Sequence, residues 1–192
     1  MNTFFENDKI EFVKLRRSHF SYLIKWLNSE HVKEWFGNST SKQITLHGIE
    51  KKLGPRIDKT ENIDCFIIFI KNEPIGYIQL YNAREFKREG YELSLIENEI
   101  KEIPKLAAID FYIGNTEFLN KGYGTEILKQ FLIKFVDNNF NACMVDPNIN
   151  NIRSINCYKK SGFVYIKDIL LSKNSSNSIL IWRNPQETCK AK

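Results

Sequence analysis

The chain has 192 residues, of which 42% are hydrophobic and 27% charged, a composition typical of one soluble globular domain over residues 1–192. The net charge is +5, but the basic residues are scattered and form no stripe with interleaved aromatic residues, which argues against nucleic-acid binding. No apolar run is long enough to cross a bilayer, and the first residues lack a secretory signal pattern, so we expect a cytoplasmic protein with no membrane partner.

The first half of the sequence predicts a strand, two helices and a β-hairpin. Apolar residues alternate with polar ones in the strand and recur at helical spacing in the helices, for which Ser18 and Ser41 are the expected caps. In chain order we expect a strand over 9–16, a helix over 19–28, a loop over 30–38 with two exposed aromatic residues, a helix from Ser41 to Gly54-Pro55, and hairpin strands over 65–70 and 75–81.

The second half begins with an acidic segment, residues 84–105, which we expect to be a loop. After it we expect a strand over 106–114, a helix to about residue 138, a strand over 142–147, a helix over 150–162, and antiparallel strands over 163–172 and 178–184 around a turn. This alternation predicts an α/β (α+β) protein with a mixed sheet and helices on its faces. Its binding crevice would lie at the strand ends marked by Gly114 and Asp146.

Two glycines, Gly122 and Gly124, stand between an apolar strand and a long helix. The first amides of a helix have no intrahelical acceptor, and the helix N-terminus carries partial positive charge. Without side chains at these positions, and with Lys121 beside them, a diphosphate could reach the amides. The alternative is that both glycines only form a tight turn. The segment is neither a GxxxxGK[ST] loop nor a GxGxxG fingerprint with an acidic ribose ligand.

Three further features bear on ligands. The segment from Glu89 to Glu102 is strongly acidic within a basic chain, which fits either a receptor for a cationic small molecule or a solvated loop. Asp110 interrupts an apolar strand, where a carboxylate is costly to bury unpaired, and a structural lysine is one possible partner. The cysteines are widely spaced with no histidine nearby in sequence, so we expect buried free thiols, no zinc site and no need for a metal.

Two motifs resemble those of the GCN5-related N-acetyltransferase (GNAT) superfamily. Its acetyl-coenzyme A loop has the fingerprint [RQ]xxGx[GA], which here is LNKGYG, with Leu119 at the Arg/Gln position. A second family motif, Nxx[AS]xxxYxKxGF, is matched throughout by NIRSINCYKKSGF, from Asn151 to Phe163. The motifs occur in the family's order, and the resemblance covers nearly the whole chain. It implies the GNAT fold, a central, mixed, mostly antiparallel, twisted sheet of about seven strands flanked by four helices.

Within the superfamily, the sequence resembles the aminoglycoside 6′-N-acetyltransferases. AIDFYIG resembles their GIDQFIG, HVKEWFG their HIVEWWG, and NEPIGYIQLY their GEPIGYAQSY. Their loop likewise has an apolar residue at the Leu119 position, whereas the match fails over residues 84–105, a segment expected to contact the acceptor. The resemblance implies an acetyltransferase that uses acetyl-coenzyme A as co-substrate and acetylates a cationic amine in a ternary complex. The 6′-amine of an aminoglycoside is the expected acceptor, so the enzyme would confer antibiotic resistance.

The resemblance also implies roles for individual residues. Asp110 would hold the acceptor ammonium and take its proton directly or through water, and Tyr158 would protonate the departing thiolate. Asn151 would support the pantetheine or cap its helix. The expected cofactor-binding residues are Phe111, Tyr112, Ile113, Leu119, Asn120, Lys121, Gly122, Tyr123, Gly124, Thr125, Asn151 and Ser154. The expected substrate-binding residues are Glu34, Trp35, Glu92, Asp110 and Asp146.

Several alternatives stay open. Trp35 fits core packing as well as an acceptor wall, and Asp146 fits the start of an Asp-Pro turn. The acceptor could be a polyamine, a hydroxylated lysine of siderophore synthesis or a protein amine. The alternative class is a non-catalytic acyl-coenzyme A-binding module. A monomer and a homodimer are both compatible with the sequence.

Overall fold

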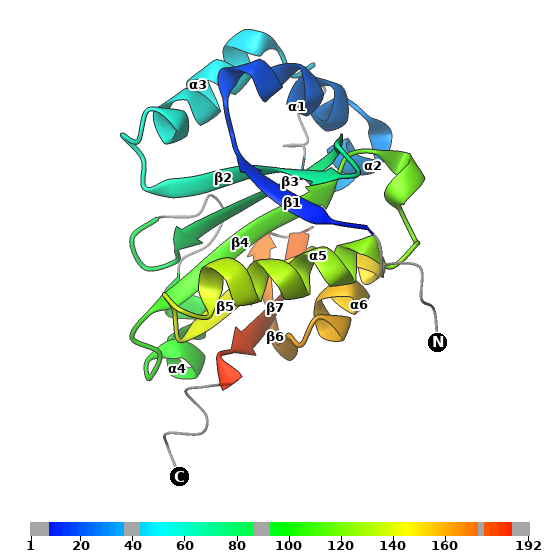
Figure 1. The fold of residues 1–192 in the computed structure, drawn as a ribbon. Helices are drawn as coiled ribbons and strands as arrows, with labels where there is room; N and C mark the ends of the chain where they lie inside the picture. The colour runs from blue at the N-terminus through cyan, green and yellow to red at the C-terminus, as the bar shows by residue number, and fades with distance from the viewer. Residues whose placement is uncertain (1–7, 37–42, 87–92, 173–174, 186–192) are drawn as a thin grey trace. The chain divides into compact units, whose positions relative to one another are not determined.

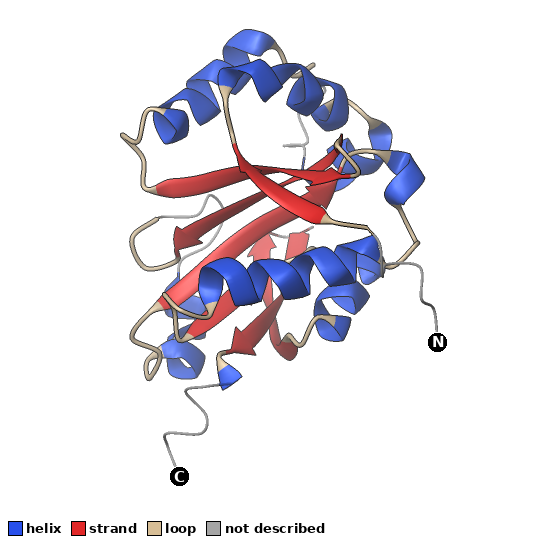
Figure 2. Cartoon of the chain, in the orientation of Figure 1, coloured by secondary structure: helices blue, strands red, loops and turns tan. Residues whose placement is uncertain are grey.

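The computed structural model describes residues 8–36, 43–86, 93–172 and 175–185, and its seven strands form one sheet (Figures 1 and 2). The strands are β1 (Ile10–Lys14), β2 (Ile63–Ile70), β3 (Glu73–Asn82), β4 (Leu106–Ile113), β5 (Ala142–Val145), β6 (Val164–Ser172) and β7 (Ser175–Arg183). Their order in the sheet is β1-β2-β3-β4-β5-β7-β6. β4 and β5 are parallel, whereas β1 is antiparallel to β2, and β7 is antiparallel to both β5 and β6. The prediction of a mixed, mostly antiparallel sheet is confirmed.

Six α-helices occur in the described part of the chain, two more than predicted. They are α1 (Phe20–Leu27), α2 (Glu30–Phe36), α3 (Leu46–Ile57), α4 (Glu97–Ile100), α5 (Tyr123–Phe131) and α6 (Ile152–Lys160). The additional helices, α2 and α4, are short and lie in segments that we predicted as loops. In α2, the Ser29 carbonyl accepts hydrogen bonds from the Val32 and Lys33 amides, and the Val32 side chain is buried. Tertiary burial thus stabilises a helix too short to be stable alone.

The caps of α1 and α3 differ from the prediction. A 3₁₀ turn precedes α1, so His19 rather than Ser18 occupies the cap position. Ser41 lies outside the described residues. The cap of α3 is Thr45, whose hydroxyl accepts a hydrogen bond from the Gly48 amide at 3.2 Å. A Thr hydroxyl is an effective N-cap acceptor, as a Ser hydroxyl would be.

The residues group into two compact units, which are described separately. The amino-terminal unit comprises residues 1–79 and 110–121, and the carboxy-terminal unit comprises residues 80–109 and 122–192. Strands β3 and β4 therefore contribute residues to both units. That the chain forms a single domain stays a prediction.

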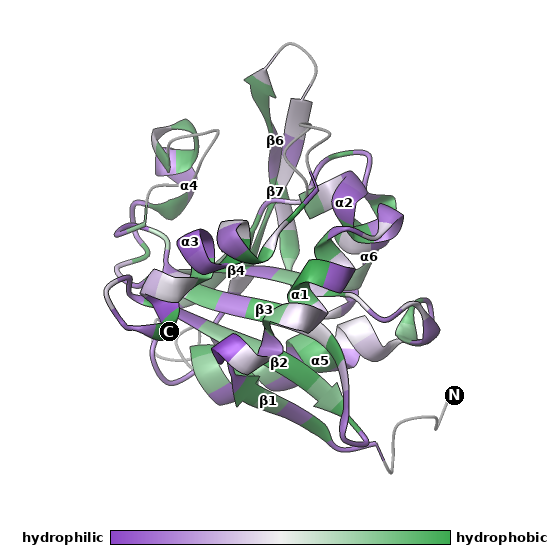
Figure 3. Ribbon diagram, turned by 90° about the horizontal axis from the view of Figure 1, so that it is seen from above, coloured by the Kyte–Doolittle hydropathy of each residue, from purple (hydrophilic) through white to green (hydrophobic). Residues whose placement is uncertain are grey.

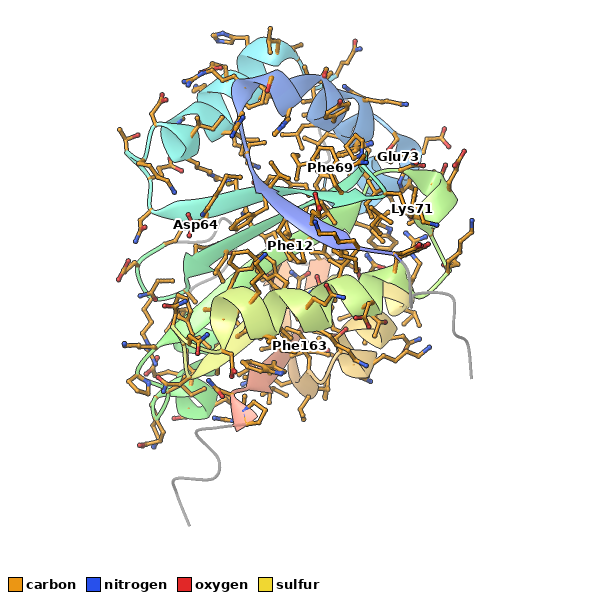
Figure 4. All side chains as sticks on the ribbon, viewed as in Figure 1. Phe12, Asp64, Phe69, Lys71, Glu73 and Phe163 are labelled. Carbon is orange, nitrogen blue, oxygen red and sulfur yellow. The ribbon has the colours of Figure 1, made fainter. Side chains whose placement is uncertain are left out.

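In the amino-terminal unit, α1 and α3 lie side by side (Figure 1). Figure 3 shows hydrophilic and hydrophobic residues along α3, as expected for a helix that buries one face. The β2–β3 hairpin turns at Lys71 and Asn72, whose φ angles of 51° and 63° match a two-residue type I′ turn. Lys71 is labelled at this turn in Figure 4, and Asp64 is labelled near the start of β2.

In the carboxy-terminal unit, α5 packs against α6, and α6 packs against β7. A π-helical turn, Leu132–Val136, continues α5, which confirms the prediction of one long helix after the glycines. The β6–β7 hairpin is also confirmed, with Ser172 opposite Ser175. β7 begins at Ser175, so residues 175–177, which we predicted as part of the turn, belong to the strand.

Candidate functional site

Asp110 is the polar residue within the apolar strand β4, and its side chain is half-buried. Its Oδ2 atom accepts a hydrogen bond of 2.5 Å from Nε2 of Gln79, which lies on the neighbouring strand β3. One partner of the carboxylate is therefore a neutral amide, where the sequence analysis had suggested a lysine.

Gln79 is itself held by two buried donors. Arg56 Nη1 donates to Gln79 Oε1 at 2.6 Å, and the Tyr77 hydroxyl is 2.7 Å from the same oxygen. Arg56 and Gln79 are each only 7% exposed, and Arg56 Nε also donates to Glu61 Oε2 at 3.1 Å. The sequence analysis selected none of these residues. The signal that could have found Gln79 is the same as for Asp110, a polar side chain inside an apolar strand.

Burial and neighbouring groups shift the pKa values of the titratable side chains in and next to this network. Burial raises the pKa of Tyr77 well above its usual range, so this residue remains a neutral hydroxyl donor. Burial also raises the pKa of the Cys65 thiol, whose Sγ lies 3.0 Å from the Tyr77 hydroxyl. Burial opposes ionisation of Arg56, but its neighbours outweigh this effect and the pKa of Arg56 is raised, so its guanidinium stays charged.

An aromatic cluster adjoins Asp110 within the same unit. Tyr112 follows two residues later, so the two side chains project from the same face of β4. The Tyr112 ring centroid is 5.6 Å from that of Tyr77, 4.9 Å from that of Phe36 on α2, and 6.4 Å from that of Trp26 on α1. Burial raises the pKa of Tyr112. The Tyr112 ring therefore packs in this cluster, and the contact of Tyr112 with a cofactor stays a prediction.

Helix α2 is attached to the end of β4. Its Phe36 ring packs edge-on against Tyr112, and His31 Nε2 lies 3.2 Å from the Ile113 carbonyl oxygen. Of the predicted acceptor residues on α2, Glu34 is exposed and Trp35 is half-buried. The Phe36 ring of α2, which sequence analysis did not select, contacts Tyr112 of β4. The role of Trp35 in acceptor binding stays a prediction.

The two glycines at the start of α5 have different backbones. Gly122 is the N-cap with φ 88°, a left-handed conformation that side chains disfavour, and its carbonyl accepts from the Thr125 and Glu126 amides. Gly124 lies in the first helical turn and has no positive φ. The turn therefore requires glycine at Gly122 and not at Gly124. That Gly124 leaves the helix amides open to a diphosphate stays a prediction.

The other predicted loop residues surround this helix start. Asn120 also has a left-handed backbone, with φ 58°, and both Asn120 and Lys121 are exposed. Leu119 has an extended backbone and is half-buried, as is Tyr123. Their contacts with a cofactor stay predictions.

Helix α6 carries the second motif. The Asn151 side chain accepts a hydrogen bond from the Ser154 amide at 3.1 Å, so Asn151 caps α6, which is one of its two predicted roles. Tyr158 is 6% exposed, and its ring meets Phe163 edge-on at 5.4 Å. A mostly buried phenol whose ring is fixed by packing is suited to present its hydroxyl in one direction.

Helix α6 is also joined to the first turn of α5. The Ser161 hydroxyl donates to the Thr125 carbonyl at 3.3 Å, and Thr125 Oγ1 lies 3.7 Å from Cys157 Sγ. Burial raises the pKa of the Cys157 thiol. The second motif is therefore in direct contact with the first turn of α5 within the carboxy-terminal unit.

The described part of the acidic segment is anchored by packing, although Glu97 and Glu102 are exposed. Lys167 on β6 pairs with Glu99 at 3.1 Å, and Arg84 donates to the Ile100 carbonyl at 2.7 Å. Three isoleucines of this segment are buried, namely Ile96, Ile100 and Ile103. Glu92, a predicted substrate-binding residue, lies outside the described residues. Asp146 is half-buried, with Asn177 Nδ2 at 3.4 Å from its Oδ2.

Cys65 and Cys143 are buried free thiols, as predicted, whereas Cys157 is only half-buried. Cys189 lies outside the described residues. Among the described residues, no three His, Cys, Asp or Glu side chains are grouped so that they could hold a metal ion. No helix there is both long and apolar enough to cross a membrane.

The family model of the acetyltransferase (GNAT) domain matches residues 16–171. The chain belongs to this family. This match confirms the resemblance that the two motifs indicated. The sheet of seven strands is the fold expected of a GNAT protein.

The similar proteins include aminoglycoside acetyltransferases and a spermidine acetyltransferase. This GNAT chain is 29% identical to an aminoglycoside N(6′)-acetyltransferase type 1 of Klebsiella pneumoniae over 158 residues, covering 82% of this chain and 75% of that protein. Its fold matches AAC(6′)-Ib in complex with coenzyme A and kanamycin, with a TM-score of 0.75 and 23% identity over 96% of this chain and all of that one. It also matches spermidine N-acetyltransferase from Vibrio cholerae in complex with coenzyme A and spermine, with a TM-score of 0.68 and 13% identity over 91% of this chain and 95% of that one.

Proposed function

We propose that this GNAT protein transfers the acetyl group of acetyl-coenzyme A to the 6′-amine of an aminoglycoside. The observation that carries the proposal is the 29% identity to an aminoglycoside N(6′)-acetyltransferase over 82% of the chain. The half-buried carboxylate of Asp110 within the apolar strand β4 supports a cationic acceptor. A cytoplasmic location, predicted from the sequence, suits an enzyme that consumes acetyl-coenzyme A.

Asp110 is the proposed acceptor-binding group and base. Its carboxylate attracts the ammonium of the acceptor and removes one proton, directly or through water, which leaves a neutral amine with a lone pair. The amine nitrogen then attacks the thioester carbonyl carbon. Backbone N–H groups at the end of β4 are the proposed donors to the carbonyl oxygen as it gains charge.

Tyr158 is the proposed acid for the leaving group. The carbon–nitrogen bond forms as the carbon–sulfur bond breaks, and the thiolate takes a proton from the phenol. The second proton that the nitrogen loses passes through water to the phenolate and restores the phenol. A phenol suits this step because it remains protonated at neutral pH and is still able to donate. The amides around Gly122 and Gly124 are the proposed seat of the coenzyme diphosphate.

A pair of aminoglycosides tests the acceptor. Neomycin and paromomycin differ in carrying an amine or a hydroxyl at the 6′ position, so the proposal predicts release of coenzyme A with neomycin and little with paromomycin. Product analysis by NMR should place the acetyl group on the 6′ nitrogen. Spermidine and lysine serve as competing acceptors. Transfer to spermidine and to none of the aminoglycosides would overturn the proposal.

An Asp110→Asn variant tests the base. Gln79 Nε2 can still donate to the asparagine carbonyl oxygen, so the fold should be retained. We expect acetyl transfer to fall about 100-fold or more, the range typical of a lost general base. Unchanged turnover with a folded variant would rule out Asp110 as the base.

A further inference from the structure

A buried network of three side chains crosses the amino-terminal unit from α3 to β4. Arg56 on α3 donates to Gln79 on β3 at 2.6 Å, and Gln79 donates to Asp110 on β4 at 2.5 Å. These three residues, the Arg56 network, connect a cation that is 7% exposed to a half-buried carboxylate. Both charges are partly removed from water, so the contacts that compensate them carry more weight than surface pairs do.

Only one orientation of the Gln79 side-chain amide is favourable in the Arg56 network. Gln79 Oε1 faces two donor groups, the Arg56 guanidinium and the Tyr77 hydroxyl. If the amide turned over, its NH₂ group would face those donors and its oxygen would face the Asp110 carboxylate. The NH₂ group would then repel the Arg56 guanidinium, and the amide oxygen would repel the Asp110 carboxylate. The guanidinium therefore sets which end of Gln79 meets Asp110.

We propose that Arg56 is a positioning residue that acts through Gln79 to hold the Asp110 carboxylate ready for the acceptor amine. This inference rests on the proposed function, because it takes Asp110 as the acceptor-binding group. The cation behind the amide polarises its N–H group, which strengthens the hydrogen bond to the carboxylate and fixes one rotamer. A carboxylate in one rotamer meets the ammonium without a further ordering cost.

A purely structural role for Arg56 is the competing explanation. Arg56 Nε donates to Glu61 at 3.1 Å, and this pair alone could attach α3 to the segment that leads into β2. Glu61 is 40% exposed and does not lie on the path from Arg56 to Asp110. Removing Glu61 therefore weakens the structural branch and leaves the Arg56 network intact.

The test compares Arg56→Met with Glu61→Gln. Methionine preserves much of the apolar stem of arginine and removes the charge and the donors. We expect Arg56→Met to lower kcat/KM for neomycin about 10- to 100-fold, the effect of losing a charge-assisted hydrogen bond, with KM for acetyl-coenzyme A unchanged. Arg56→Lys, which keeps the cation, should recover part of the loss. Glu61→Gln should keep the wild-type kcat/KM, and thermal unfolding verifies that each variant is folded.

A second variant covers the case in which Arg56→Met does not fold. Tyr77→Phe keeps the buried ring and removes the other donor to Gln79 Oε1. We expect it to lower kcat/KM for neomycin less than Arg56→Met, again with KM for acetyl-coenzyme A unchanged. A folded Arg56→Met or Tyr77→Phe enzyme with wild-type kcat/KM overturns the inference, as does a rise in KM for both substrates together.

Failure of the proposed function is distinguishable from failure of this inference. If the wild-type enzyme acetylates no aminoglycoside, the proposed function fails, and NMR then tests the network directly. The Gln79 side-chain amide signal, assigned by its loss in Gln79→Leu, should be protected from solvent exchange in the wild type and lose that protection in Arg56→Met. An amide signal that does not change in Arg56→Met overturns the role of Arg56.

Discussion

Replacing Gly124 by alanine should make the fold more stable and the binding of acetyl-coenzyme A weaker. Gly124 lies in the first turn of α5 without a positive φ, so alanine is sterically acceptable to the backbone there. In a helix, alanine is more favourable than glycine by up to about 1 kcal/mol. For a chain of this size, that gain raises Tm by about 2–4 °C.

The loss of binding follows from the same methyl group. If the diphosphate approaches the amides at the start of α5, a Cβ at Gly124 displaces it from at least one N–H donor. A hydrogen bond to a charged group contributes about 1.5–3 kcal/mol. The Kd for acetyl-coenzyme A should therefore rise about 10- to 150-fold. Thermal unfolding gives the first quantity, and titration calorimetry gives the second.

Gly48→Ala is the matched control. Gly48 is an exposed glycine in the first turn of α3, and a Cβ there would lie 3.6 Å from Thr45 Oγ1, an ordinary contact. This variant should show a similar gain in Tm with an unchanged Kd. If Gly124→Ala binds acetyl-coenzyme A as tightly as the wild type does, the diphosphate does not sit against this turn and the reasoning fails.

Three further predictions concern other parts of the molecule. Tyr158→Phe should keep the Kd for acetyl-coenzyme A and lower kcat about 100-fold or more, since only the proton donor is lost; unchanged turnover would exclude the acid role. Gly114→Ala should destabilise the fold by about 1–3 kcal/mol in thermal unfolding, because its Cβ would clash with the ring of the buried Trp26, and a Tm equal to the wild type would contradict this packing. Cys157 should react with iodoacetamide more slowly than glutathione at pH 7 and faster as pH rises, because burial raises the pKa of its thiol and only the thiolate reacts. Equal rates at pH 7, measured by mass spectrometry, would contradict that shift.

Sequence patterns were most reliable where local chemistry determines structure. The strands from β1 to β7 were predicted from alternating patterns or apolar runs, and the helix predicted over 150–162 is observed as α6 and is followed by Gly162, which has φ 96°. The short helices α2 and α4 were missed, because neither has enough residues to show a helical period. Their stability comes from the burial of Val32, Ile96 and Ile100, which only packing reveals.

The candidate site, like the fold, was predicted from the sequence only in part. The sequence alone shows the two motifs, the family and the residues Gly122, Asp110 and Tyr158. Asp110 is recognised as a charged residue within an apolar strand, and Gly122 and Tyr158 occupy fixed positions of the motifs. Only the tertiary structure brought Arg56 and Gln79 to Asp110, since these residues come from three elements that are distant along the chain. Hydrogen-bond direction depends on which atoms meet in space, and no local pattern records it.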